Sequence, residues 1–234
     1  MTANTRPGKI DADTGFMGVL MLDTRFARPL GDIGNPLTFA ELGIPVRYAT
    51  VTGASPQRIV QQGGPALLQP FVDAGQALVR EGARMVCTSC GFLVRWQAQL
   101  DRELPVPVHT SSLLACAGLL RPGILTIDAQ SLDRSTLRAA GVADTTPVHG
   151  VAPGCEFQRR ILGNAVQMNL AQAREDVVQA ARQLVSAHPG ITDIVFECTN
   201  MPPYRQAVMD ATGRPVVDIM TVLQRAWSER LAAR

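Results

Sequence analysis

Two cysteines stand at equivalent places in two similar parts of the sequence. Cys87 follows the apolar run 83–86, Cys198 comes shortly after the apolar run 193–196, and a threonine comes next in both cases. In each part a helix, a strand and a second helix are expected to follow. The end of a parallel strand before a helix lies at the sheet edge where α/β proteins bind ligands. We therefore expect Cys87 and Cys198 to face each other across one cleft and to transfer protons on opposite faces of a ligand.

Polar residues next to the two cysteines complete the expected site. A helix N-terminus offers unpaired amide groups and partial positive charge, which lower the pKa of a thiol and attract a carboxylate. Hydroxyl and amide side chains can bind the same carboxylate. The sequence therefore predicts a small carboxylate-bearing substrate that is held by Thr88, Ser89, Thr199 and Asn200. The alternative for each cysteine is a small, buried apolar residue.

Three further cysteines and one histidine carry weaker signals. Cys90 forms a C-x-x-C motif with Cys87, which could serve redox chemistry, but we favour packing because that chemistry leaves the repeat unexplained. Cys116 lies in an apolar helical pattern and is expected in the core. Cys155 precedes a helix and either lines the cleft or is buried, and His149 either reaches the cleft or is structural.

Residues near the first two expected strands are additional candidates. Asp23 ends the first strand, where it either assists proton transfer at Cys87 or caps the next turn. Asn35 lies in a loop rich in glycine and proline, and it either contacts the ligand or stabilises the loop through an Asx turn. Arg25 and Arg47 could pair with a second carboxylate of the substrate or remain solvated.

Composition and charge exclude several classes of protein. The chain has 234 residues, of which 46% are hydrophobic and 18% charged, so it can bury a substantial core and is not disordered. A net charge of +2 with scattered cations lacks the basic stripe of a nucleic-acid-binding protein. No apolar run approaches the roughly 18 residues of a membrane helix, and residues 1–16 do not resemble a signal peptide. We expect a cytoplasmic protein with neither nucleic acid nor membrane as its partner.

The sequence offers little for binding cofactors. Lys9 is the only lysine, so a pyridoxal phosphate Schiff base has almost no candidate residue. Neither a P-loop nor a G-x-G-x-x-G motif is present. The three histidines are too scattered for a histidine–cysteine zinc site, and five cysteines are an odd number for a disulfide framework. We expect neither a cofactor nor a metal.

Short β-rich runs alternate with helical patterns, which is typical of an α/β protein with parallel sheets. Strands are expected at 17–22, 45–51, 83–86, 106–108, 124–127, 147–151, 193–196 and 215–217. A loop is expected at 23–38, and helices at 71–81, 92–103, 111–120, 132–140, 157–170, 176–187, after 203, and from about 221 to 232. We predict two similar α/β lobes with parallel four-stranded sheets, the first at 1–116 and the second at 117–217, with the active site in the cleft between them.

The paired Cys-Thr motifs resemble those of the aspartate/glutamate racemase superfamily. The segment Pro-Gly-Ile-Leu-Thr at 122–126 resembles the strand that opens the second lobe of that family, and Asp23 matches an acidic residue of glutamate racemases. The likeness covers about residues 18–231. It implies that the C-terminal helix, 218–234, completes the first lobe, that Thr126 contacts substrate, and that the chain could form a homodimer.

The resemblance also implies a reaction. Members of the family are racemases that need no pyridoxal phosphate, with hydantoin racemases, maleate isomerases and arylmalonate decarboxylases as relatives. Here Thr88, Ser89 and Asn200 stand at positions where the racemases usually carry other residues, but both cysteines are present. The implied function is a cofactor-independent isomerase that racemises or epimerises an amino acid or another small carboxylate. A maleate-type cis–trans isomerase, a decarboxylase relative and a non-catalytic two-lobed binding protein remain as alternatives.

Overall fold

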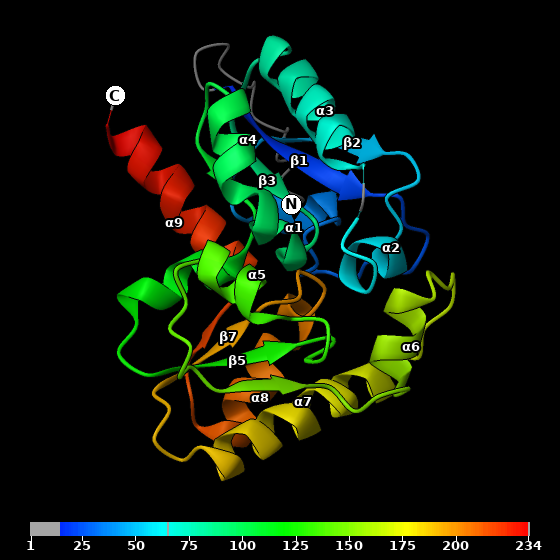
Figure 1. Cartoon of the computed structure of the whole chain (residues 1–234), viewed down its shortest axis with the longest axis vertical. Helices are drawn as coiled ribbons and strands as arrows, with labels where there is room; N and C mark the ends of the chain where they lie inside the picture. The colour runs from blue at the N-terminus through cyan, green and yellow to red at the C-terminus, as the bar shows by residue number, and fades with distance from the viewer. Residues whose placement is uncertain (1–14, 65, 234) are drawn as a thin grey trace, which may run out of the picture.

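Two parallel sheets form the centres of two lobes that stack along the long axis of the molecule (Figure 1). The computed structural model describes residues 15–64 and 66–233, so Lys9 and the rest of the N-terminal stretch lie outside the described residues. In the first sheet the strand order is β2 (Val46–Val51), β1 (Phe16–Leu22), β3 (Ala83–Thr88) and β4 (Val108–His109). In the second sheet it is β6 (Val148–Gly150), β5 (Pro122–Thr126), β7 (Asp193–Phe196) and β8 (Val216–Val217). The prediction of two parallel four-stranded sheets is confirmed.

The short helices of the first lobe begin where a side chain caps the first free amide groups. Helix α1 (Pro36–Glu41) begins after Asn35, whose side chain accepts a hydrogen bond from the Leu37 amide, and α2 (Pro56–Val60) begins after Ser55 in the same way. A proline at the first helical position favours both starts. The loop expected at 23–38 therefore ends at Asn35, and α2 was not expected. The other helices of this lobe are α3 (Leu68–Arg80), the 3₁₀ helix η1 (Gly91–Trp96), α4 (Gln97–Glu103) and the 3₁₀ helix η2 (Ser112–Gly118).

Capping side chains also begin four helices in the second half of the chain. Asp133, Cys155, Asn169 and Asp218 each accept a hydrogen bond from a backbone amide at the start of a helix. The helices of this half are α5 (Arg134–Ala139), α6 (Glu156–Leu162), α7 (Leu170–Ala187), the 3₁₀ helix η3 (Pro202–Tyr204), α8 (Arg205–Thr212) and α9 (Ile219–Ala232). None of the described helices is long and apolar enough to span a bilayer.

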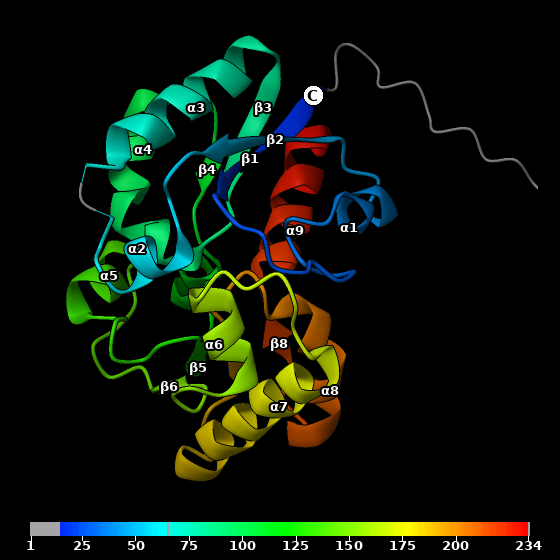
Figure 2. The same cartoon turned by 90° about the vertical axis from the view of Figure 1, so that its right-hand side faces the viewer.

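The last helix, α9, crosses back from the second sheet to the first lobe (Figures 1 and 2). Its residues Leu223 and Trp227 share a buried cluster with Met17 and Val19 of β1. Burial of such large side chains contributes on the order of 1.5–3 kcal/mol each. This packing therefore ties the end of the chain to the first lobe.

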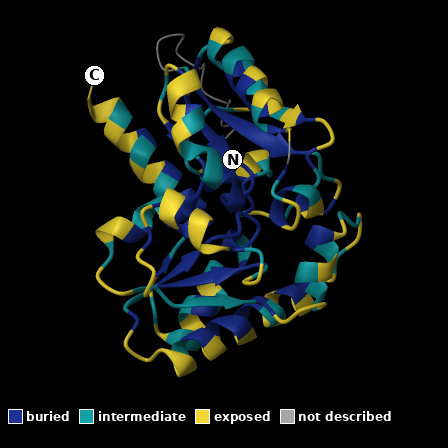
Figure 3. Ribbon diagram, in the orientation of Figure 1, coloured by how far each residue is buried: buried dark blue, intermediate teal, exposed yellow. Residues whose placement is uncertain are grey.

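The two lobes meet at the carboxyl ends of their strands. The Thr199 hydroxyl donates to the Ser89 carbonyl at 2.6 Å, which joins the segment after β7 to the segment after β3. On another side the Asn164 side chain accepts from the Arg25 amide at 2.7 Å and donates to the Asp23 carbonyl at 3.0 Å. The inner strands of the two sheets, β1, β3, β5 and β7, are largely buried (Figure 3), so these ends are presented from two packed cores.

Candidate functional site

A small cavity lies between the lobes at the carboxyl ends of β3 and β7. It is lined by four residues predicted to bind or react with substrate, Ser89, Cys198, Thr199 and Asn200, and also by Cys90 and Glu197. Apolar residues close the remaining walls, among them Leu22, Phe26, Val60, Phe92, Ile127 and Ile161. Its volume of about 20 Å³ is enough for roughly one water molecule. The structure therefore shows this site in a closed form.

Cys198 is held by a chain of polar contacts that crosses between the lobes. Its Sγ donates to Asn200 Oδ1 at 3.8 Å, and Asn200 Nδ2 donates to Asp32 Oδ2 at 2.7 Å. Burial, followed by the nearby Glu197 carboxyl, raises the pKa of the Cys198 thiol well above its ordinary value. In this form of the protein Cys198 is therefore a neutral thiol with a fixed orientation.

Asp32 is a site residue that the sequence did not reveal. It is buried and accepts hydrogen bonds from Arg28 Nη1 and from the Gly34 amide, both at 2.7 Å, in addition to the bond from Asn200. Both oxygens of the carboxylate thus accept hydrogen bonds. A loop was expected at 23–38, but no local pattern indicates which of its residues reaches the second lobe.

Glu197 is the second residue that sequence reasoning missed. It is fully buried, its Oε2 accepts a hydrogen bond from Thr126 Oγ1 at 2.8 Å, and its Oε1 has no hydrogen-bond partner among the described residues. Burial raises the pKa of this carboxyl to about 8. One signal in the sequence could have revealed Glu197: it is a charged residue at the end of a buried strand, directly before Cys198. Thr126, which was expected to contact substrate, thus makes its hydrogen bond to Glu197.

Gly91 makes room for Glu197. A Cβ atom at this position would lie 2.2 Å from the Glu197 carbonyl oxygen and 2.4 Å from Oε1, which is far inside van der Waals contact. A glycine at the start of η1 is thus required for the buried carboxyl to occupy its place.

Cys87 does not line this cavity. It is fully buried beside Met17, Val19 and Met85, and burial raises the pKa of its thiol far above its ordinary value. Side chains alternate between the two faces of a strand, so the register of β3 directs Cys87 with Met85 toward the cluster that α9 covers. The expected pairing of Cys87 and Cys198 across one cavity is therefore not found.

Cys90 takes the place on the cavity that was expected for Cys87. It is buried, and burial together with Glu197 raises the pKa of its thiol to about 12, although the amides of Phe92 and Leu93 oppose this rise. No disulfide links it to Cys87, because both thiols are free. Cys90 is thus a second neutral thiol at the same site.

The other candidates have partners outside the cavity. Asp23 Oδ2 accepts from the Gly53 amide at 3.0 Å, and Asn35 caps α1. Thr88 Oγ1 donates to the Thr110 carbonyl at 2.8 Å. Arg47 forms an ion pair with the exposed Glu81 at the end of α3, and His149 Nε2 lies 3.1 Å from Gln183 Oε1. Their predicted contacts with substrate stay predictions.

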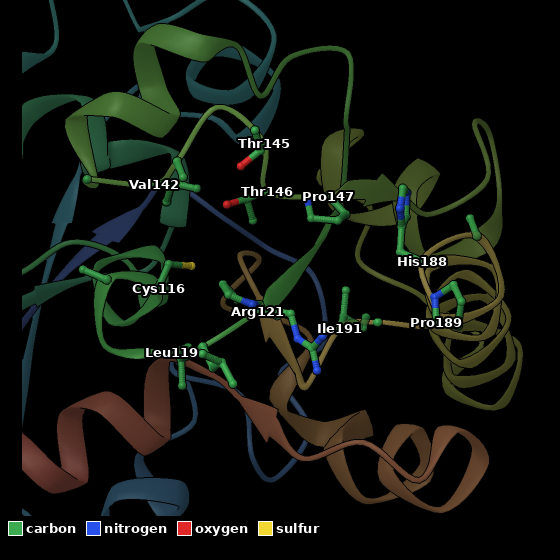
Figure 4. A pocket seen from close by; sticks show the side chains of 17 residues that line it. Cys116, Leu119, Arg121, Val142, Thr145, Thr146, Pro147, His188, Pro189 and Ile191 are labelled. Carbon is green, nitrogen blue, oxygen red and sulfur yellow. The ribbon is translucent and has the colours of Figure 1, made fainter.

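A larger hollow of about 650 Å³ opens elsewhere on the second lobe (Figure 4). Cys116, Arg121, Thr146 and His188 are among the residues around it. It lies at the amino ends of β5 and β6, whereas α/β proteins bind ligands at the carboxyl ends of their strands. Among the described residues no group of three or more His, Cys, Asp or Glu is placed to hold a metal ion. The interlobe cavity is therefore the candidate site.

Sequence comparison gives relatives with a named activity, although no family model matches the chain. The chain is 29% identical over 216 residues to a dimethylsulfoniopropionate lyase of Durusdinium sp. clade D, covering 86% of this chain and 70% of that protein. It is 30% identical over 238 residues to dimethylsulfoniopropionate lyase 6 of Emiliania huxleyi, covering 94% of this chain but only 61% of the relative. The chain thus spans less than two thirds of the second relative.

These relatives correct the expected reaction. They are enzymes, which supports the expectation of an enzyme, but they are lyases. The predicted racemase or epimerase with two cysteine bases is therefore overturned. The repeat of Cys-Thr motifs misled the prediction because it reflects the shared fold of the two lobes, which does not fix the reaction.

Solved structures of three racemase-superfamily proteins align over nearly the whole chain. Allantoin racemase from Pseudomonas fluorescens aligns with a TM-score of 0.58 at 15% identity, covering 93% of this chain and 92% of that one. Arylmalonate decarboxylase gives 0.57 at 14%, covering 93% of both chains. An aspartate racemase homologue from Pyrococcus horikoshii gives 0.55 at 15%, covering 94% of this chain and 100% of that one. The resemblance seen in the sequence is confirmed at the level of architecture: the chain has the fold of the aspartate/glutamate racemase superfamily.

Proposed function

We propose that this protein is a lyase that cleaves dimethylsulfoniopropionate. The observation that carries the proposal is the similarity to lyases of this name over 86–94% of the chain. The interlobe cavity supports it, because the matched region includes a buried thiol with a fixed hydrogen-bond partner, Cys198 with Asn200.

The reaction requires one base. Dimethylsulfoniopropionate carries a carboxylate at one end and a dimethylsulfonium group on its β carbon. A base removes a proton from the α carbon, the C–H electron pair forms the new C=C bond, and the C–S bond breaks with its pair going to sulfur. The products are acrylate and neutral dimethyl sulfide, and the proton stays on the base. Because the leaving group needs no proton, a second acid is unnecessary, unlike in racemisation, which needs a group on each face.

We assign the role of base to Cys198. Its thiol must lose a proton to act, and burial together with Glu197 opposes this in the closed form. A cation within about 4–6 Å favours the charged form of a thiol. The sulfonium group of the substrate supplies that cation, so binding of the substrate lowers the pKa of Cys198 where the base is needed.

Substrate entry requires the closed cavity to open. The cavity has room for about one water, and the proposed substrate is several times larger. The bonds of Asn164 to Arg25 and Asp23 close the lobes on the side of α6. If these hydrogen bonds break, the lobes can separate and admit substrate. When the bonds form again, the closed site excludes water from the base.

The experiment is a direct product assay. Purified protein is incubated with dimethylsulfoniopropionate in D₂O, dimethyl sulfide is measured in the headspace by gas chromatography, and acrylate is followed by NMR. We expect the two products in equal amounts, with heat-denatured protein as the control. Absence of dimethyl sulfide across a range of pH would overturn the proposal.

A further inference from the structure

We propose that Glu197, in its protonated form, is a further substrate-binding residue whose Oε1 donates a hydrogen bond to the carboxylate of the substrate. The inference rests on the proposed function for the identity of the substrate, but its geometry is independent of the reaction. It concerns a residue of the cavity that the single-base mechanism does not use.

The hydrogen bonds of Glu197 show which oxygen is available. Oε2 accepts from Thr126 Oγ1 at 2.8 Å, so it has a donor directed at it. The amide of Asp128 donates to the same Thr126 oxygen at 3.4 Å and holds that side chain in place. Oε1 is buried and has no partner among the described residues. The acid proton therefore belongs on Oε1, where it lacks an acceptor.

The surroundings of Glu197 favour the neutral acid. A carboxyl taken out of water remains charged only if it is paired, and no ion pair among the described residues includes Glu197. One cation, Arg95, and one acidic group, Asp128, act on Glu197. The other groups near it are the Thr126 hydroxyl and the thiols of Cys90 and Cys198. Burial dominates and raises the pKa of Glu197 to about 8, although the hydrogen bond from Thr126 and the charge of Arg95 lower it; Asp128 adds to the rise.

A neutral acid at this place would serve the reaction as well as binding. Removal of the α proton moves negative charge onto the substrate carboxylate, and a hydrogen bond to that carboxylate strengthens as the charge grows. A carboxylic acid kept neutral by an apolar site can supply such a bond at neutral pH. Gly91 keeps the space beside Oε1 free of a side chain.

The first test needs no variant. Binding of propionate, which has the carboxylate but no sulfonium, is measured by calorimetry between pH 6.5 and pH 9.5. Because the protonated acid is the donor, raising the pH through about 8 removes it. We expect affinity to fall about 30-fold over this range. A pH-independent affinity, no binding of propionate at any pH, or tighter binding of ethyldimethylsulfonium at high pH with propionate unaffected would overturn the inference.

Variants separate hydrogen bonding from structure. Glu197→Gln keeps a donor, so we expect propionate affinity at pH 6.5 within about 10-fold of the parent protein and no loss up to pH 9.5. Glu197→Leu has no donor and should bind about 10- to 100-fold more weakly, with a matching fall in kcat/KM. Glu175→Gln, on the exposed face of α7, is the matched control. If Glu197→Leu binds propionate as the parent does, the inference is wrong.

Failure of the inference and failure of the proposed function give different results. Release of dimethyl sulfide by the parent protein tests the function alone. Propionate binding that depends on Glu197 in a protein without lyase activity would overturn the function and support the inference. Lyase activity with propionate binding that is independent of pH and of Glu197 would support the function and overturn the inference.

Discussion

Cys87 and Cys198 are matched by the sequence repeat, but the two lobes place them in different surroundings. Cys87 lies inside β3, where it pairs in register with Val19 and His109. Strand β7 stops at Phe196, so Cys198 lies two residues beyond its sheet, in the turn toward η3. The pleat fixes the direction of Cys87 toward a core cluster, whereas Cys198 is free to point at the cavity. Equivalent positions in a repeat therefore do not guarantee equivalent chemistry.

The largest effect is expected at Cys198. Cys198→Ser keeps the size of the side chain but raises the pKa of the base by several units, so we expect release of dimethyl sulfide to fall by about 10³-fold or more. Initial rates by gas chromatography measure it. Cys116→Ser is the matched control, because Cys116 is a buried thiol outside the cavity. Retention of more than a tenth of the activity by Cys198→Ser would show that this thiol is not the base.

Asp32 offers a second test of the difference between the two cysteines, because its hydrogen bond to Asn200 supports Cys198 and not Cys87. Asp32→Asn removes the charge that Arg28 pairs with, and Arg28 is itself largely buried. Breaking a buried pair costs about 3–5 kcal/mol, and we expect a loss of stability toward the lower end of this range. Activity of the folded variant should fall about 10-fold as Asn200 loses its orientation.

Denaturant unfolding and lyase rates below the unfolding transition test the two effects of Asp32→Asn separately. Asp73→Asn on the surface of α3, where the side chain meets Gln69, is the control. If stability falls while the rate per folded molecule stays at the parent value, Asn200 does not need Asp32 for its orientation.

The smallest effect on activity is expected at Cys87. Cys87→Ser places a hydroxyl in an apolar cluster, which should destabilise the protein by about 1–3 kcal/mol. The rate per folded molecule should change by less than about 5-fold, since the side chain does not line the cavity. Thermal unfolding and initial rates at low temperature measure both. A loss of activity as deep as that of Cys198→Ser would break the comparison and restore a role for both thiols.

Much of the fold was predictable because it depends on local patterns. Apolar runs that alternate with helical periods gave the eight strands, with boundaries shifted by one or two residues in most cases. The helices expected after the two cysteine-bearing segments begin as 3₁₀ turns, η1 and η3, and neither turn has a capping side chain. Helix α2 was missed because its five residues are too few to show a period.

The sequence by itself determined two parallel lobes and the placement of Ser89, Cys198, Thr199 and Asn200 at one cavity. These follow from the rule that ligands bind where parallel strands end, which needs only the order of the elements. The tertiary structure alone decided the surroundings of Glu197 and Asp32. Their partners Thr126 and Asn200 are 71 and 168 positions away along the chain. Burial and pairing at such distances set the charge of a carboxyl, and no local pattern of residues contains that information.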